Sequence, residues 1–181
     1  MKVVLLRHGE VDMQWNKKYS SAEFDRACRN YDTSPIKEIS KEFKLKNKYN
    51  EAKIYISTLP RTKETAVKVF GENIFYKSEL LNEVPLKSFI DTGSKLPLGI
   101  WNVMGRLQWF FNNSRQRETK QETEERAKKA ILMLEENNED CYVVTHGFYL
   151  KVLLKELEKE GFKIDKRRIK LKNLEEVVAV K

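Results

Sequence analysis

Short apolar runs rich in β-branched residues recur along the chain and predict buried β-strands, because each run is too short for a helix. The runs at residues 2–6 and 141–145 are each followed closely by a His-Gly pair. Further strands are predicted at residues 53–57, 73–76, 168–172 and 176–180.

Apolar residues at helical spacing lie between these runs and predict helices. One helix begins near Pro60 and ends at Gly71, a residue suited to a C-terminal cap. Amphipathic helices are also predicted at residues 119–137 and 148–160. Less regular segments are expected to form a helix from Pro35 to about residue 48, a short aromatic-rich helix within residues 101–111, and a loop with a short helix at residues 11–30.

The strand–helix–strand order at residues 53–76 implies a right-handed parallel crossover and therefore an α/β fold. No repeat or low-complexity linker interrupts the chain, so residues 1–181 are expected to form one domain. Residues 77–118 combine Gly, Pro and aromatic residues without clear periodicity. This segment is expected to form a lid that sets substrate specificity.

Composition excludes several classes of protein. No apolar run approaches the roughly 18 residues of a membrane span, and the opening run is too short for a signal peptide. The two cysteines have neither disulfide nor metal-site spacing, so a cytoplasmic location is expected. The net charge is +8, but the late basic run lacks the interleaved aromatics of a stacking platform, and no nucleic-acid partner is expected.

The chain has only two histidines, His8 and His146, and both stand at the end of a predicted buried strand. Ligands of open α/β sheets bind outside the carboxyl ends of the strands. The repeated context is therefore the one that a pair of catalytic imidazoles would need. Two strand-end histidines without a shared role are the alternative.

Two arginines beside the histidines indicate an anion site. Arg7 precedes His8, and Arg61 follows the strand-end Ser57 at the start of the helix that begins near Pro60. A guanidinium group binds phosphate through paired hydrogen bonds, and a helix N-terminus adds its positive end. No cluster of Cys, His and carboxylate residues has the spacing of a metal site, so no metal is expected.

A histidine in such a pocket can attack phosphorus if its imidazole is neutral and has one free nitrogen. The second imidazole can stay protonated and hydrogen-bond the phosphoryl oxygens. The leaving alcohol then needs a proton from a carboxylic acid whose pKa is raised by the bound phosphate and by burial. Glu83, flanked by the apolar Leu81, Val84 and Leu86, is the first candidate, and a solvated loop carboxylate is the alternative.

These segments resemble the motifs of the histidine phosphatase superfamily, the phosphoglycerate mutase-like proteins, over residues 3 to about 155. The resemblance rests on Arg-His-Gly-Glu at residues 7–10, Ser-Thr-Leu-Pro-Arg-Thr-Lys-Glu-Thr-Ala at residues 57–66, Leu-Leu-Asn-Glu-Val at residues 80–84, Val-Thr-His-Gly-Phe at residues 144–148, and more loosely Glu118-Thr119 with Arg126. It implies a three-layer α/β/α fold with a mostly parallel central sheet, and no metal or organic cofactor.

The resemblance also implies roles for the matching residues. His8 would be the phosphorylated nucleophile, and Glu83 would donate the proton to the leaving group. The residues expected to bind the phosphoryl group are Arg7, Arg61 and His146, and those expected to contact the rest of the substrate are Gln14, Ser57 and Gly147.

The sequence departs from the family pattern in two places. Val11 and Gln14 stand where the family often has threonine and asparagine, which bears on substrate contacts beyond the phosphate. Pro-Leu-Lys at residues 85–87 stands where a pattern with glycine and tryptophan usually follows the acid. Glu79 and Glu10 are therefore kept as alternative proton donors.

The expected function is that of a metal-independent phosphatase of the histidine acid phosphatase type. Such an enzyme transfers the phosphoryl group of a small phosphorylated metabolite to water through a phosphohistidine. One alternative is mutase-type transfer to another hydroxyl of the same sugar acid, but the short chain and the missing continuation motifs favour the phosphatase. A basic protein that only binds phosphate or nucleic acid is the second alternative, and the oligomeric state stays open.

Overall fold

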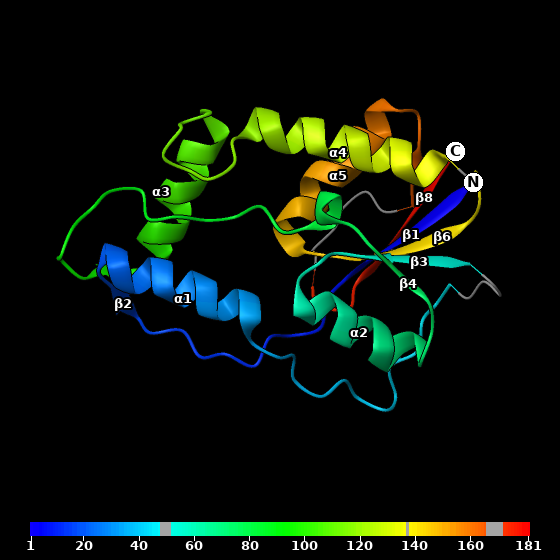
Figure 1. The fold of residues 1–181 in the computed structure, drawn as a ribbon, viewed down its shortest axis with the longest axis horizontal. Helices are drawn as coiled ribbons and strands as arrows, with labels where there is room; N and C mark the ends of the chain where they lie inside the picture. Colours follow the sequence, from blue (N-terminus) through cyan, green and yellow to red (C-terminus); the bar gives the residue numbers. More distant parts are fainter. Residues whose placement is uncertain (48–51, 137, 166–171) are drawn as a thin grey trace.

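A six-stranded sheet forms the centre of the computed structural model, which describes residues 1–47, 52–136, 138–165 and 172–181. Its strands are β1 (Lys2–Arg7), β3 (Lys53–Ile56), β4 (Phe75–Lys77), β6 (Cys141–Thr145), β7 (Lys163–Ile164) and β8 (Glu176–Val180). They lie in the order β4-β3-β6-β1-β8-β7 (Figure 1). The first four in this order are parallel, whereas β8 runs antiparallel to β1 and to β7.

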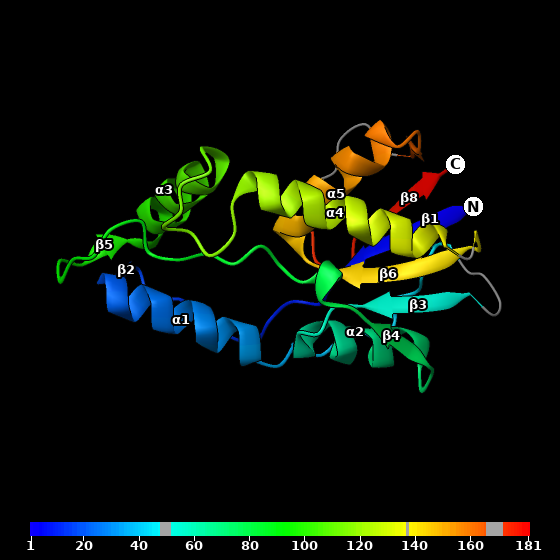
Figure 2. The ribbon, with the colours of Figure 1, turned by 45° about the horizontal axis from the view of Figure 1, so that its top comes forward.

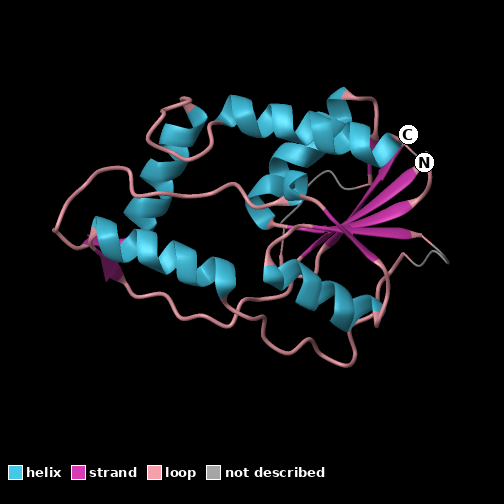
Figure 3. Ribbon diagram, viewed as in Figure 1, coloured by secondary structure: helices cyan, strands magenta, loops and turns pink. Residues whose placement is uncertain are grey.

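Helices cover both faces of this sheet (Figure 1, Figure 3). α4 (Lys120–Glu135) and α5 (Gly147–Lys159) lie on one face, and α2 (Pro60–Phe70) lies on the other. The predicted three-layer α/β/α fold with a mostly parallel central sheet is therefore confirmed. The predicted cap is also confirmed, because Gly71 ends α2 with a φ of 72°.

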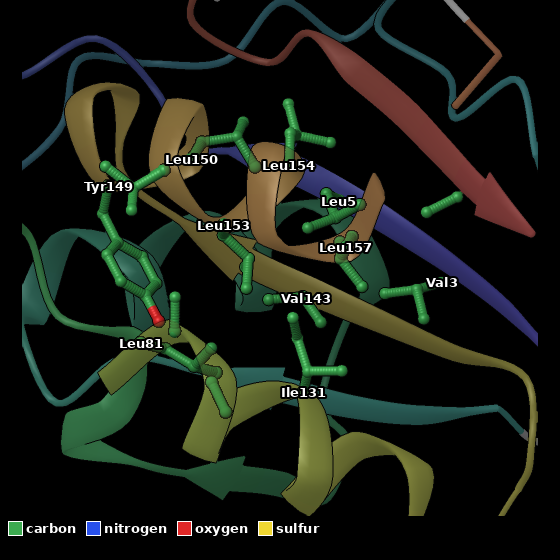
Figure 4. Close-up of a cluster of buried hydrophobic side chains, with 14 of the residues drawn as sticks. Val3, Leu5, Leu81, Ile131, Val143, Tyr149, Leu150, Leu153, Leu154 and Leu157 are labelled. Carbon is green, nitrogen blue, oxygen red and sulfur yellow. The ribbon is translucent and has the colours of Figure 1, made fainter. Parts of the chain in front are cut away.

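Alternate side chains of β1 are buried on opposite faces of the sheet, which explains why the run is apolar at successive positions. Val3 and Leu5 join the cluster under α4 and α5 (Figure 4), and Val4 and Leu6 join the cluster under α2. All four side chains are fully buried. Each contributes roughly 1.5–3 kcal/mol of hydrophobic stabilisation, so β1 is a firm support for the residues that follow it.

A second group of elements lies beyond the carboxyl ends of the parallel strands (Figure 1, Figure 2). It consists of α1 (Ser21–Thr33), α3 (Leu98–Phe110) and a two-stranded sheet of β2 (Lys18–Tyr19) and β5 (Leu96–Pro97). Phe24 of α1 stacks on Trp101 of α3 with 5.4 Å between the ring centroids. Trp101 Nε1 also donates to Tyr19 O at 3.0 Å, so aromatic packing holds α1 and α3 together.

The prediction for residues 11–48 is wrong in two places. α1 is a 13-residue helix, because Ser20 and Glu23 form a capping box at its start. Pro35 follows the end of α1 instead of starting a helix, and residues 36–47 contain no helix. Proline disfavours helical backbone in the residue before it, and Ser34 is accordingly extended.

Other segments differ from the prediction in extent. α3 has 13 residues and begins at Leu98, so it is longer than the helix predicted within residues 101–111. The short strand β7 pairs with β8 and has no predicted counterpart. The strand predicted at residues 168–172 lies almost entirely outside the described residues. None of the helices in the described ranges combines the length and the apolar character that crossing a bilayer requires.

Candidate active site

The register of the sheet brings both histidines to one edge. Arg7 pairs with Thr145 across β1 and β6, so His8 and His146 leave the sheet next to each other. The backbone N–H of His8 donates to Thr145 O at 2.9 Å. The two imidazole centroids lie 5.1 Å apart, close enough for both rings to contact one small ligand.

His8 has one ring nitrogen occupied and one with a free lone pair. Its Nδ1 lies 2.6 Å from the carbonyl oxygen of Gly9, which can only accept a hydrogen bond. Nδ1 therefore carries the proton, and Nε2 keeps its lone pair. Thr65 Oγ1 accepts from the N–H of Gly9 at 2.9 Å. A Cβ at residue 9 would lie 3.1 Å from Ile36 Cδ1, so glycine suits this tight turn.

His146 has both ring nitrogens occupied. Arg61 Nε donates to Nδ1 at 3.1 Å, and arginine cannot accept. The proton of the neutral ring is therefore on Nε2, which lies 2.7 Å from Ser57 Oγ. The Ser57 hydroxyl also lies 2.9 Å from Thr62 Oγ1. Ser57, predicted to contact substrate, is buried here and orients His146.

Burial makes the protonated form of both imidazoles unfavourable. Desolvation lowers the pKa of His8 to about 3, and the charges of Arg61 and Arg7 act in the same direction. The pKa of His146 lies well below its ordinary value, through burial first and then through Arg61. Both rings are therefore neutral near neutral pH. This state suits attack by His8, but it differs from the imidazolium expected at His146.

The guanidinium group of Arg61 is fully buried and connects α1 with the histidines. Besides His146, it contacts Asp32 Oδ1 through Nη1 at 3.1 Å, and its Cζ lies 5.0 Å from the centre of the Tyr31 ring. Its Nη2 has no hydrogen-bond partner among the described residues. A buried cation with an unused donor is well suited to bind an anion.

Arg7 lies against the first residue of α5. A Cβ on Gly147 would come within 2.9 Å of Arg7 Nε, so any other residue at position 147 would force the Arg7 side chain to move. The Arg7 side chain also donates a hydrogen bond to Tyr31. Burial raises the pKa of Tyr31, whereas this hydrogen bond and the positive charges of Arg61 and Arg7 lower it. Gly147, predicted to contact substrate, therefore leaves the space that the Arg7 side chain occupies.

Glu83 caps the N-terminus of α5, the helix that follows His146. Its Oε1 accepts from the backbone N–H groups of Tyr149 at 2.8 Å and Val84 at 2.9 Å. Its Oε2 accepts from Phe148 N–H at a longer 3.2 Å. The carboxyl group is therefore fixed at the positive end of the helix whose N-cap is His146.

The segment that carries Glu83 is held in place by α4. Arg126 donates to the carbonyl oxygens of Leu80 at 2.9 Å and Asn82 at 2.8 Å. Its other two nitrogens bind the Glu118 carboxylate at 2.9 and 3.0 Å. The loosely matched pair Glu118 and Arg126 therefore positions the Glu83 segment.

A cavity of about 580 Å³ lies in front of these groups and is lined by residues from α1, α2, α3 and residues 79–86. Among the predicted residues, Arg61, Glu83 and Glu79 line it. His8 and His146 are 1% and 0% exposed, and neither of them lines the cavity. Arg61, which lines the cavity and donates to His146 Nδ1, therefore links the cavity to the histidine pair.

Two residues predicted for the site, Gln14 and Glu10, do not line the main cavity. Gln14 is exposed and lines a separate hollow of about 290 Å³ together with Tyr19. Glu10 is exposed and pairs with Lys37 at 2.5 Å. Of the two alternative proton donors, Glu79 lines the main cavity and Glu10 does not.

Several cavity residues were not predicted, among them Tyr31 and Asp32 of α1 and Asn102 and Arg106 of α3. Arg106 Cζ lies 3.7 Å from the centre of the Phe148 ring, and no residue in the described ranges hydrogen-bonds its Nη1. The capping box before α1 is a sequence signal that places Tyr31 and Asp32 on a helix. The packing of α1 against α3 has no comparable signal.

Comparison with known proteins agrees with this geometry. Residues 3–179 match the family model described as histidine phosphatase superfamily (branch 1). Similar solved structures include a phosphoglycerate mutase from Bacillus anthracis, with a TM-score of 0.60, 16% identity, and coverage of 99% of this chain and 88% of that one. No curated protein matches the chain.

Two phosphatases also share the fold. A phosphoserine phosphatase mutant from Entamoeba histolytica, solved in complex with phosphoserine, has a TM-score of 0.55 and 16% identity over 98% of this chain and 89% of that one. A mycobacterial glucosyl-3-phosphoglycerate phosphatase has a TM-score of 0.52 and 17% identity over 87% and 79%.

Proposed function

Because the chain belongs to the histidine phosphatase superfamily, branch 1, we propose that it hydrolyses phosphomonoesters through a phosphohistidine at His8. The superfamily and the similar structures indicate a phosphatase or a mutase. One observation carries the choice of His8: its imidazole is neutral, its Nδ1–H is held by Gly9 O, and its Nε2 has a free lone pair.

His8 attacks the phosphorus atom of the substrate in the first step. A bond forms between Nε2 and phosphorus while the bond between phosphorus and the leaving oxygen breaks. The ring becomes positively charged, and the hydrogen bond from Nδ1–H to Gly9 O stabilises this charge.

Arg7, Arg61 and His146 bind the phosphoryl oxygens during this step. Arg61 offers its unused Nη2 donor, and its Nη1 becomes available when the substrate displaces Asp32. A phosphoryl dianion next to His146 favours the protonated ring. Protonation at Nδ1 ends its acceptance from Arg61 Nε, so the Nδ1–H of His146 and the released N–H of Arg61 can both donate to the developing charge.

Glu83 donates a proton to the leaving oxygen. In this proposal the transferred proton is on Oε2, which receives one hydrogen bond, at 3.2 Å, whereas Oε1 receives two. In the second step water attacks phosphorus and gives a proton to Glu83. The bond between nitrogen and phosphorus breaks, and His8 returns to its neutral form.

The substrate in this proposal is a small phosphorylated metabolite. A cavity of about 580 Å³ has the size of a small-molecule site. Two similar structures are named for their action on phosphoserine and glucosyl-3-phosphoglycerate. Residues 77–118 carry Glu83 and α3, and they serve as the lid that sets specificity.

A mutase is the second candidate, because a phosphoglycerate mutase is among the similar structures. Incubation with a panel of phosphomonoesters that includes phosphoglycerate separates the two reactions. A phosphatase releases inorganic phosphate from at least one ester. Isomerisation of phosphoglycerate without phosphate release would overturn the proposal.

A further inference from the structure

The outward side of α3 is apolar along its length. Six large apolar side chains between 38% and 73% exposed lie there or directly after the helix, and we call them the α3 apolar face: Ile100, Val103, Met104, Leu107, Phe110 and Phe111. Their spacing places them on one side of a helix of 3.6 residues per turn. The opposite side carries Trp101, Gly105 and Trp109, which are buried.

A helix that is apolar on both sides is normally covered on both. The inner side of α3 meets this expectation, because Trp101 packs between Phe24 and Phe89. The side chains on the outer side are exposed when all residues that the structure describes are taken into account. Their exposed fractions correspond to roughly 600 Å² of apolar surface, at the upper end of what monomeric proteins present as one patch.

We propose that the α3 apolar face is the contact surface between two copies of this chain related by a two-fold axis. Two such faces bury roughly 1,200 Å² together, the lower limit for a stable specific interface. A two-fold axis brings the same surface of each copy into contact. With α3 antiparallel to its partner, Phe110 and Phe111 of one copy lie near Ile100 of the other, and Val103 and Leu107 lie near the axis.

The distribution of charge favours a second copy as the occupant. Each chain carries a net charge of +8, which opposes the association of two copies, so a surface on which they meet must add no like charges at the contact. α3 contains no acidic residue and no lysine, and its one charged residue, Arg106, lines the cavity. Interface centres are depleted of charge and enriched in aromatic residues and methionine in the same way.

A lipid surface fits this helix less well. Helices that lie in the membrane interface carry lysine and arginine along their polar side. The side of α3 opposite the apolar face instead carries Trp101, Gly105 and Trp109, which are buried. It therefore has no row of cations that could bind lipid headgroups.

The contact has a consequence for the cavity. Asn102 and Arg106 line the cavity from α3, and Val103 and Leu107 directly follow them on the α3 apolar face. A partner packed against this face restrains the helix that provides one wall of the cavity.

Sedimentation equilibrium of the full chain at micromolar concentrations tests the proposal. The wild type should form a reversible dimer. The double variant Val103→Lys with Leu107→Lys should be monomeric, because its new cations meet near the two-fold axis. Leu132→Lys is the matched control, since Leu132 is 67% exposed but belongs to the half of α4 far from α3 (Figure 1). This variant should dimerise like the wild type.

Circular dichroism shows whether the double variant is folded. If it is not, Phe111→Gln replaces it, because Phe111 is 73% exposed and lies just outside the helix; this change should weaken the dimer. A wild type that is monomeric at all these concentrations would overturn the proposal, and so would a folded variant that dimerises like the wild type. A monomeric wild type that binds vesicles of anionic phospholipid would assign the face to lipid.

Discussion

The carboxylate of Asp32 lies 3.1 Å from Nη1 of Arg61, the arginine that also holds His146. The Asp32 side chain is 47% exposed, whereas that of Arg61 is 0% exposed. The buried Arg61 guanidinium group is therefore paired with a carboxylate that is accessible to solvent. In the proposed mechanism, this carboxylate and a phosphoryl oxygen compete for the same guanidinium group.

Replacing Asp32 with Asn should strengthen phosphate binding. The change removes the competing charge and keeps the size of the side chain. Inorganic phosphate should then inhibit about tenfold more strongly, the effect expected for one charge-assisted hydrogen bond. Inhibition constants against an aryl phosphate measure this. Asp91→Asn, which breaks an exposed pair with Arg115, is the control and should change nothing; equal constants for both variants would exclude the competition.

Gly147→Ala should displace Arg7 and lower kcat/KM. The new Cβ would lie within 2.9 Å of Arg7 Nε, so the guanidinium group must move away from the phosphoryl oxygens. The loss should be about tenfold or more, as for a hydrogen bond between charged groups. Gly93→Ala is the matched control, because a Cβ at Gly93 meets nothing within 4 Å. Full activity in Gly147→Ala would show that Arg7 does not depend on this space.

Glu83→Gln should show the loss of a general acid. Glutamine keeps the acceptor oxygen that caps α5 but cannot supply the proton. An alkyl phosphate has a poor leaving group, so its turnover should fall roughly 10²-fold, while nitrophenyl phosphate should be affected much less. Equal losses on both esters would mean that Glu83 only supports the site. The same pair of substrates then tests Glu79, which also lines the cavity.

Burial of His8 should make the fold sensitive to acid. The pKa of His8 is lowered from 6.5 to about 3 in the folded chain. Between these values the unfolded chain binds the additional proton, so the free energy of unfolding falls as the pH is lowered, by about 1.4 kcal/mol per pH unit. Above pH 6.5 both states are unprotonated, and this contribution to stability is fully present.

Urea unfolding across this pH range measures the effect. His8→Asn removes the titrating group, so the stability of this variant should depend less steeply on pH than that of the wild type. The comparison cancels the contribution of other titrating groups that both proteins share. Identical slopes would show that His8 titrates normally in the folded chain.

The sheet and the paired histidines could be predicted because their signals are local. β1 and β6 are apolar at successive positions, and the pairing of Arg7 with Thr145 then brings the following histidines together. The prediction at Pro35 is wrong because proline is common both in the first turn of a helix and just after the end of one. In the structure Ser34 is the extended C-cap of α1, and Pro35 follows it.

The outer wall of the cavity could not be predicted, because it depends on contacts between distant segments. The stacking of Phe24 on Trp101 fixes α1 against α3, and this packing leaves Asp32 next to Arg61. No periodicity or spacing in either segment specifies that pair. The same reason explains Gln14, which is expected to contact substrate because it stands where the family often has asparagine but lies on a separate hollow.

Trapping the phosphohistidine is the most direct test of His8 as the nucleophile. Wild-type protein mixed with a substrate and quenched rapidly should carry one phosphoryl group that is acid-labile, stable to alkali and located at His8 by mass spectrometry. His8→Ala should form no such adduct and should lose activity by orders of magnitude, as expected for removal of a nucleophile. An adduct on another residue, or a His8→Ala variant that keeps more than about a tenth of the wild-type rate, would contradict the account.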